Sequence, residues 1–124
     1  MASTLSVLER MRLLDSTGTQ YGFASAHSGD PGATGTANEL TGGSPAYARK
    51  AITWASATSA TPSVKALAAT FPVFDIPAGS TVSHVGFWTL VTGGTYGGCI
   101  DVTDEVYAGQ GTYTFNVGPP SISL

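Results

Sequence analysis

The sequence predicts a mainly β fold, an antiparallel β-sandwich or barrel with one short N-terminal α-helix, and three observations support it. Segments with alternating apolar residues recur about every eight to twelve residues and end in glycine-rich turns, as in sandwiches and barrels. Only the first segment has helical periodicity. A chain of 124 residues has room for one hydrophobic core. We therefore expect a helical arm at residues 1–18, followed by a single β-sandwich domain at residues 19–124.

The helical segment is predicted to extend from Ser3 to Asp15. Its apolar residues recur at the spacing of one helix face and are Val7, Leu8, Met11 and Leu14. Ser6 followed by Glu9 is a capping-box pattern, and the Ser-Thr-Gly run at 16–18 predicts the end of the helix. The apolar face indicates that this helix docks, either on its own sheet or on a neighbouring subunit.

Period-two alternation predicts the first strand over residues 21–27, with Ser25 and His27 on one face. The Asp-Pro-Gly turn at 30–32 ends this strand. From there to Tyr47 the chain is rich in Gly, Thr, Ala, Asn and Ser, so we expect a long ordered loop.

The remaining predicted strands are residues 51–54, 64–69, 71–77, 82–90, 96–108 and 112–117. Prolines bracket the apolar centre of 71–77, which places that segment at a sheet edge or between sheets. Segment 82–90 is apolar on both faces, with Val82 and Trp88 on the same one, so we expect it to be buried from both sides. The last segment alternates apolar residues with Thr and Asn, which predicts one solvent-exposed face.

The chain is poor in charge, with 10% charged residues and a net charge of -3, against about 25% charged residues in a typical domain. Its mean hydropathy of +0.14 argues against disorder. Five basic residues cannot neutralise many phosphates, so nucleic acid is not an expected partner. No run approaches the roughly 18 apolar residues of a membrane span, and charges at 9, 10 and 12 interrupt the first apolar stretch before a signal peptide forms. We therefore expect a soluble protein without a membrane partner.

Catalytic groups are scarce, since His27 and His84 are the two histidines of the chain. His27 lies near Ser28 and Asp30, but three residues within one turn cannot easily adopt the geometry of a hydrolytic triad. His84 lies in the most apolar strand and is expected to be a hydrogen-bonded core or interface residue. The sequence therefore predicts no enzymatic activity.

Ligand sites receive little support from the sequence, and no metal or cofactor is predicted. Asp101, Asp104 and Glu105 form one carboxylate cluster, but their spacing fits no calcium loop, and a solvated strand end explains them equally well. Cys99 is the single cysteine, so an internal disulfide is excluded, and we expect it to be a small buried hydrophobe. Stacking of sugars on aromatic side chains is a further alternative, although the apolar neighbours of both tryptophans, Trp54 and Trp88, favour core packing.

Several motifs together resemble a known family. They are the N-terminal helix, Ser28-Gly-Asp-Pro-Gly32, Asn38-Glu-Leu-Thr-Gly-Gly43, Tyr47-Ala-Arg49 leading into Ala51-Ile-Thr-Trp54, and Val82-Ser-His-Val-Gly-Phe-Trp88. In this order they are similar to small tailed-bacteriophage virion proteins of the actinobacteriophage type. Members of that family are known as tail-fibre-like or minor tail proteins, and similar small β-proteins serve as capsid decoration proteins.

The resemblance implies a non-enzymatic part of a phage particle. A fibre needs length from a coiled coil or from repeats, and the chain has neither. The first hypothesis is therefore a capsid decoration (minor capsid, cement) protein that binds the outer shell and stabilises it. A minor tail or tail-fibre-like protein is the alternative, and a carbohydrate-binding module for host attachment is a further one. The implied partners are the major capsid protein or tail proteins and the chain itself, as a homotrimer, in virions assembled in the host cytoplasm.

Candidate assembly contacts come from the helix and from the loop. They are Leu5, Leu8, Met11, Asn38, Glu39, Tyr47, Arg49 and Lys50. Arg49 and Lys50 are two of only five cationic residues, so we expect them to pair either with acidic groups of the shell or with Glu39.

Overall fold

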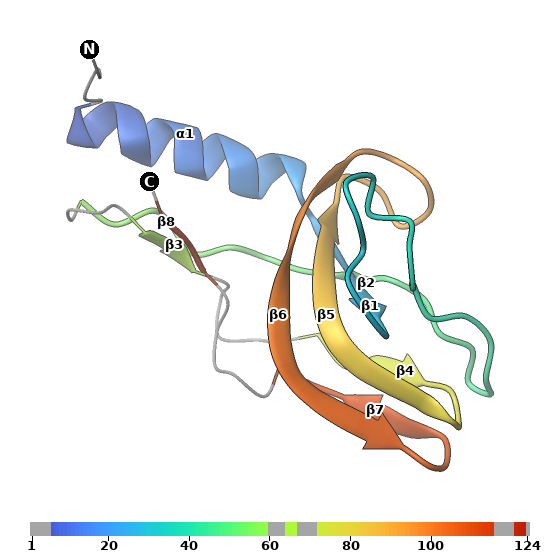
Figure 1. Ribbon diagram of the computed structural model, residues 1–124. Helices are drawn as coiled ribbons and strands as arrows, with labels where there is room; N and C mark the ends of the chain where they lie inside the picture. The colour runs from blue at the N-terminus through green and yellow to red at the C-terminus, as the bar shows by residue number, and fades with distance from the viewer. Residues whose placement is uncertain (1–5, 60–63, 67–71, 116–120, 124) are drawn as a thin grey trace.

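The computed structural model describes residues 6–59, 64–66, 72–115 and 121–123 (Figure 1). The elements in chain order are α1 (Val7–Gln20), β1 (Phe23–His27), β2 (Lys50–Ala51), β3 (Val64–Ala66), β4 (Phe74–Ile76), β5 (Ser80–Trp88), β6 (Tyr96–Tyr107), β7 (Gly111–Tyr113) and β8 (Ser121–Ser123). All the strand pairs between them are antiparallel. The expected mainly β, antiparallel fold with a short N-terminal helix is confirmed.

The strands form a four-stranded sheet, in the order β2-β1-β5-β6, and two two-stranded sheets, β4-β7 and β3-β8. The β4-β7 pair faces the four-stranded sheet, whereas α1 and the β3-β8 pair lie together to one side (Figure 1). The four-stranded sheet begins at β2 and ends at β6. Among the described strands the arrangement is therefore sandwich-like, and the sheet does not close into a barrel.

The hydrophobic core lies between the four-stranded sheet and the β4-β7 pair. The sheet contributes Ala24, Ala26, Val85, Phe87 and Val102, and the opposing pair contributes Phe74, Ile76 and Tyr113. The rings of Phe74 and Tyr113 lie 6.4 Å apart, within the range of aromatic packing. The prolines around β4 are compatible with its place, because among the described strands β4 pairs with β7 alone.

Strand β5 departs from simple alternation, which corrects the predicted face of Val82. The pairing of β5 with β6 shifts register between Val82 and His84. Val82 pairs with Glu105 and His84 with Asp101, so the register changes by two residues at this bulge and the simple alternation of faces along β5 is interrupted. Val82 therefore joins Val85 in the core, whereas Trp88 lies on the opposite face of the sheet and hydrogen-bonds there. The expectation that this strand is buried from both sides is confirmed.

Helix α1 begins as the sequence predicts. Ser6 is its N-cap, and its hydroxyl oxygen accepts a hydrogen bond from the backbone N–H of Glu9 at 3.2 Å. Leu14 is buried, with 2% of its surface exposed, and Met11 is half-buried. Leu8, in contrast, is 78% exposed, so the apolar stripe is only partly covered within the described chain.

The end of α1 differs from the prediction, because the helix continues through the Ser-Thr-Gly run to Gln20. The hydroxyl of Thr17 donates to the carbonyl of Leu13 at 2.9 Å, and the N–H of Tyr21 donates to the carbonyl of Thr17 at 3.1 Å. These bonds extend the helix beyond the predicted stop, as tertiary context often overrides local propensity.

Several predicted strands are shorter than expected; 21–27 is seen as Phe23–His27 and 71–77 as Phe74–Ile76. The segment 51–54 forms a strand only as Lys50–Ala51, although Ile52 and Trp54 both pack on the core as predicted. The last predicted strand, 112–117, is seen as Gly111–Tyr113. Residues 116 and 117, and the end of the predicted strand 64–69, lie outside the described residues.

Candidate functional site

The long loop between β1 and β2 is ordered, as predicted, and it is fastened to β1. An isolated β-bridge joins His27 to Glu39. The N–H of Ser28 donates to the carbonyl of Asn38 at 2.9 Å, and the N–H of Leu40 donates to the carbonyl of Ala26 at 3.1 Å. The middle of the loop therefore lies beside β1 and brings residues 39–49 next to the end of β5.

Two residues give the loop its shape. Asn38 adopts a φ of 63°, in the left-handed region that asparagine tolerates better than most residues, and its amide nitrogen donates to the carbonyl of Asp30 at 3.0 Å. Gly35 has a φ of 76°, and a Cβ at this position would overlap the ring of Tyr96. The loop therefore packs directly on β6 at Gly35.

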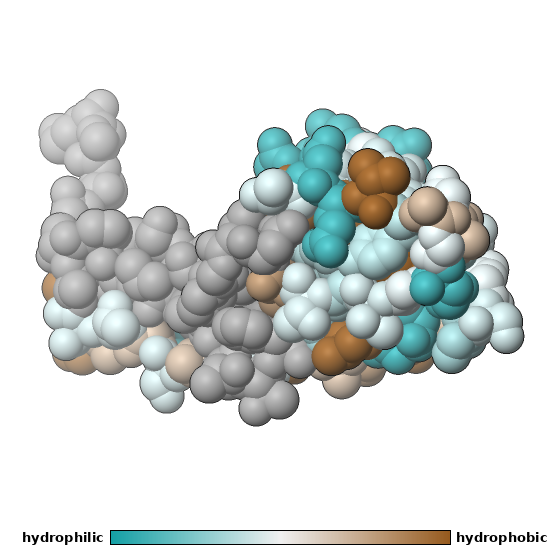
Figure 2. Space-filling model, turned by 90° about the horizontal axis from the view of Figure 1, so that it is seen from below, coloured by the Kyte–Doolittle hydropathy of each residue, from teal (hydrophilic) through white to brown (hydrophobic). Residues whose placement is uncertain are grey.

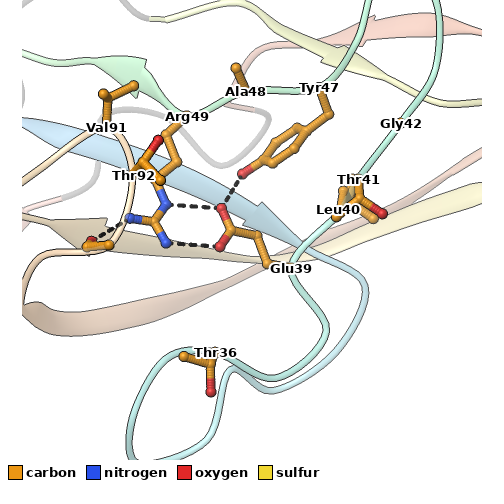
Figure 3. Close-up of a pocket in the computed structure, with 11 residues that line it drawn as sticks. Thr36, Glu39, Leu40, Thr41, Gly42, Tyr47, Ala48, Arg49, Val91 and Thr92 are labelled. Carbon is orange, nitrogen blue, oxygen red and sulfur yellow. Dashed lines mark hydrogen bonds and ion pairs between the residues drawn. The ribbon is translucent and has the colours of Figure 1, made fainter.

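Arg49 and Glu39 form a bidentate ion pair beneath this loop (Figure 3). Nε of Arg49 donates to Oε2 of Glu39, and Nη2 donates to Oε1, each at 2.9 Å. The two side chains are 9% and 19% exposed, so the pair is largely removed from water. Of the two predicted partners of Arg49, the structure therefore places Glu39 within reach.

The rest of the Arg49 guanidinium holds the turn after β5. Nη1 donates to the carbonyl of Leu90 at 3.2 Å and to that of Gly93 at 2.8 Å. The guanidinium carbon also lies 3.7 Å from the centre of the Trp88 ring, a cation–π contact. One side chain thus joins the loop, the β5–β6 turn and the outer face of the sheet.

Tyr47 is the third member of the cluster formed with Arg49 and Glu39. Its hydroxyl donates to Oε2 of Glu39 at 2.9 Å and accepts from the N–H of Ala26 at 2.9 Å. Burial, together with the neighbouring carboxylate, raises the pKa of Tyr47. Burial also opposes ionisation of Glu39, but the hydrogen bonds from Arg49 and Tyr47 outweigh it and hold the pKa of Glu39 below its usual value. At neutral pH the cluster is a charged pair beside a neutral phenol.

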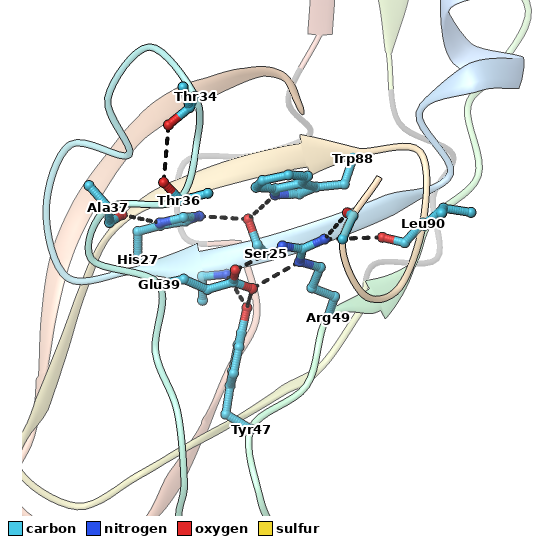
Figure 4. A network of polar contacts seen from close by, with 12 residues as sticks. Ser25, His27, Thr34, Thr36, Ala37, Glu39, Tyr47, Arg49, Trp88 and Leu90 are labelled. Carbon is cyan, nitrogen blue, oxygen red and sulfur yellow. Dashed lines mark hydrogen bonds and ion pairs between the residues drawn. The ribbon is translucent and has the colours of Figure 1, made fainter. Parts of the chain in front are cut away.

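A second network, on the same face of the sheet, runs through His27 (Figure 4). Nδ1 of His27 lies 2.9 Å from the carbonyl oxygen of Ala37, and Nε2 lies 2.7 Å from the hydroxyl of Ser25. A carbonyl only accepts, so Nδ1 carries the proton, and Nε2 of the neutral ring accepts from Ser25. Ser25 in turn accepts from Nε1 of Trp88 at 2.9 Å. Burial, the largest influence, lowers the pKa of His27 and favours this neutral form.

Ser25 and His27 have the contact geometry of a nucleophile and its base, but both side chains are completely buried. Their hydrogen bonds instead anchor the loop at Ala37. Ser28 and Asp30 follow His27 in the sequence, but the Asp30 carboxylate accepts from the N–H of Gly32 at 2.8 Å, closing a turn. The position of Ser25 two residues before His27, on the same strand face, was the available sequence signal.

A pocket of about 480 Å³ opens beside the Arg49–Glu39 pair (Figure 3). The residues that line it are polar, apart from Leu40, Ala48, Val91 and the glycines. Threonines contribute to its wall at 36, 41 and 92, and the hydroxyl of Thr36 is hydrogen-bonded to that of Thr34 at 3.0 Å. This arrangement offers hydrogen bonding next to a charged pair that is already internally neutralised.

The other predicted contact residues lie elsewhere. Lys50 faces Asp75, with 3.7 Å between Nζ and Oδ2. Leu8 and Met11 lie on α1, and Leu5 lies outside the described residues. The candidates thus fall into two regions, the helix and the loop cluster; Asn38 belongs to the second of these.

The predicted burial of Cys99 is wrong, because its side chain is exposed. Cys99 is paired with Gly86 across the β5–β6 ladder, on the face opposite the core. The next residue, Ile100, is half-buried and packs against the core, and Asp101 after it is exposed. The exposed face of β6 therefore includes the cysteine.

The carboxylates Asp101, Asp104 and Glu105 are all exposed on β6. The described part of the chain contains no group of three or more His, Cys, Asp or Glu side chains placed to hold a metal ion. His84 is half-buried, and its Nδ1 lies 2.8 Å from the hydroxyl of Ser83, so the expected hydrogen bond of this histidine is confirmed.

Both tryptophans pack within the fold, Trp54 against the core as predicted and Trp88 on the opposite face of the sheet, outside the core cluster. Trp88 is 3% exposed and lies under Arg49. Trp54 packs against Phe87 with ring centres 5.5 Å apart, and its Nε1 donates to the carbonyl of Tyr21 at 2.9 Å. Sugar stacking on Trp88 would therefore require Arg49 to leave the ring.

In the residues that the structure describes, no helix is long and apolar enough to cross a membrane. Comparison with known proteins gives one result at family level. The family model described as "Podophage GP4 fiber I protein gp80" matches residues 13–119, which include most of α1, the whole loop and its pocket. No curated protein and no solved structure matches the chain. The resemblance to phage virion proteins is thereby confirmed, and the chain belongs to the podophage GP4 fiber I protein gp80 family, a family of tail-fibre-like phage virion proteins.

Proposed function

We propose that the chain is a non-enzymatic structural subunit of the phage tail fibre. The observation that carries this proposal is the family match over residues 13–119, since the matched family is described as a fibre protein. The sequence alone favours capsid decoration, because the chain has neither heptads nor repeats to give a fibre its length. A fibre built from several proteins does not need that length from each of them, so a compact sandwich is compatible with a fibre.

The surface of the molecule is compatible with burial in a packed assembly. On the face seen in Figure 2, the described surface is mostly pale, with separate strongly hydrophilic and apolar patches. Burying charged groups is costly unless they are well paired, so a charge-poor surface loses little when it is covered. The partners in this proposal are other tail proteins and further copies of the chain, as a homotrimer.

Helix α1 is the element best placed for self-association. It lies to one side of the sandwich (Figure 1) and exposes Leu8 while burying Leu14. Exposed apolar residues on a docked helix suit a second helix of the same kind, because both then remove apolar area from water. We expect the N-terminal half of α1 to contact its copies.

Capsid decoration is the second candidate function, and the compact sandwich without repeats favours it. Such a protein binds only the assembled shell and stabilises it by mass action. Its partner would be the major capsid protein. Both functions place the chain in the virion, assembled in the host cytoplasm.

Separating heads from tails distinguishes the two functions. Particles of the phage that carries this chain are disrupted, and the head and tail fractions are probed with an antibody against the chain. The fibre function predicts that the chain accompanies the tail fraction. Recovery of the chain with the heads would support decoration instead, and its absence from both purified fractions and intact particles would contradict both.

A further inference from the structure

The pocket beside Arg49 and Glu39 is lined in part by the residues that fasten the loop, Glu39, Tyr47 and Arg49. We propose that this pocket binds one unit of a neutral polyhydroxylated ligand, such as a hexose residue of a glycan. Its volume of about 480 Å³ lies in the ordinary range of small-molecule sites. The inference does not depend on whether the chain belongs to the tail or to the head.

The charges of the pocket favour a neutral ligand. Arg49 and Glu39 carry equal and opposite charges and are joined by two hydrogen bonds of 2.9 Å. A phosphate or carboxylate ligand would compete with Glu39 for the guanidinium, and a cation would compete with Arg49 for the carboxylate. Bidentate pairs of this kind are strong, so either competition is unfavourable.

Arg49 and Glu39 each retain one unused hydrogen-bonding group, and the two groups lie on neighbouring atoms. An arginine has five N–H groups, and four of those of Arg49 are used among the described residues, which leaves one on Nη2. Oε1 of Glu39 accepts one bond, from that Nη2, and retains a lone pair. A spare donor and a spare acceptor on bonded neighbours match two adjacent hydroxyl groups, each of which can both donate and accept.

The residues that form the walls of the pocket also suit a sugar ligand. Thr41 and Thr92 add hydroxyl-bearing side chains, whereas Leu40 and Val91 add apolar surface. A sugar ring presents both kinds of surface, hydroxyls at its rim and C–H groups on its faces. An apolar ligand would cover the hydroxyls of Thr41 and Thr92 without offering them a partner, which is unfavourable.

The pocket is also preformed. Its floor is fixed by the Arg49 contacts to Leu90 and Gly93 and by the Tyr47 hydroxyl, so little ordering is required on binding. The aromatic residues first considered for sugar contact, Trp54 and Trp88, take no part in it. Trp88 acts only through Arg49, which lies over its ring.

The test is a titration of the full-length ¹⁵N-labelled chain, followed by NMR. The neutral probes are D-glucose, D-galactose, L-rhamnose and N-acetyl-D-glucosamine, and the charged probes are glucuronate and inorganic phosphate. We expect saturable shifts of the Gly42, Thr92 and Gly93 amides with at least one neutral sugar, and weaker shifts with the anions. Unchanged amides with every sugar, or stronger binding of phosphate, would overturn the proposal.

Variants locate the binding in the pocket. Thr41→Val and Thr92→Val each remove one hydroxyl and are expected to weaken binding about fivefold, the value of one ordinary hydrogen bond. Thr112→Val, on the exposed face of β7, is the matched control and should bind as the unchanged chain does. Equal affinity of all three variants would overturn the proposal, whereas the tail or head location, measured on particle fractions, would be unaffected.

Discussion

Arg49 is the residue on which the loop cluster depends most. It makes two bonds to Glu39, two to backbone carbonyls and one ring contact with Trp88. Removing one member of a largely buried ion pair leaves the other charge without a partner and costs several kcal/mol. Removing Lys50 should cost much less stability, because its contact with Asp75 is long and partly exposed.

We therefore expect Arg49→Ala to lower the free energy of unfolding by about 3 kcal/mol, and Lys50→Ala to lower it by about 0.5 kcal/mol. Urea denaturation followed by tryptophan fluorescence measures both, and Trp88 reports directly because Arg49 lies over its ring. Equal effects of the two substitutions would contradict the central position of Arg49.

His27 makes the stability depend on pH. Burial lowers the pKa of His27 in the folded chain below the ordinary 6.5, so the unfolded chain takes up a proton first as the pH falls. Stability therefore declines below about pH 6.5, by at most about 1.4 kcal/mol per pH unit for one proton. Glu39 has a lowered pKa as well, and its ionised form adds stability that is lost in a lower range, below 4.5.

Denaturation midpoints measured between about pH 7 and pH 5 test this decline. His27→Gln, which keeps a polar side chain of similar size, should remove it. His84→Gln, on the paired strand, is the control and should retain it. A midpoint that stays constant over this range in the unchanged chain would show that the neutral His27 network is wrong.

The sequence predicted one residue cluster and missed the other. Glu39 and Arg49 stood out because charged residues are few, and the motif that contains them supported their selection. The bond from Trp88 to Ser25 joins residues that meet only when β1 pairs with β5. That pairing, and the bulge in β5 between Val82 and His84, depend on tertiary contacts that no local pattern encodes.

At the scale of elements, the loop between β1 and β2 is held by close packing as well as by hydrogen bonds. Gly35 lies against the Tyr96 ring with a φ of 76°, so any side chain there meets both a clash and backbone strain. Gly109, in the turn before β7, has no atom within 4 Å of an added Cβ. Substituting each of these two glycines therefore tests whether the loop packs on β6 at Gly35.

We expect Gly35→Ala to destabilise the chain by about 2 kcal/mol, because Tyr96 must move. Gly109→Ala should change the stability by less than about 0.5 kcal/mol. Thermal unfolding of both variants measures the difference. Equal melting temperatures would mean that the loop does not pack on β6 as described.

Helix α1 carries the prediction for self-association. Leu8→Ser removes exposed apolar surface without touching the buried Leu14, so the fold should persist while association weakens. Gln20→Ser, also exposed on α1, is the control. Analytical ultracentrifugation of the three chains should show dissociation for Leu8→Ser alone. An unchanged oligomer would place the subunit contact elsewhere.

On the scale of the whole molecule, the fold class followed from the sequence because alternation and glycine turns are local signals. The end of α1 did not, since the Thr17 hydroxyl and the Tyr21 amide extend the helix beyond its predicted stop. Sandwich and barrel stayed open for a similar reason, because closure depends on which strands meet at the edges. The composition also shows that the chain has few charged residues, which suits a protein packed against its neighbours.

The place of the chain in the particle is the central claim, and a reconstruction of the phage particle tests it most directly. The account predicts density for the sandwich, with α1 on one side, in a fibre attached to the tail. Density of this shape on the outer face of the capsid shell, and none on the tail, would contradict it.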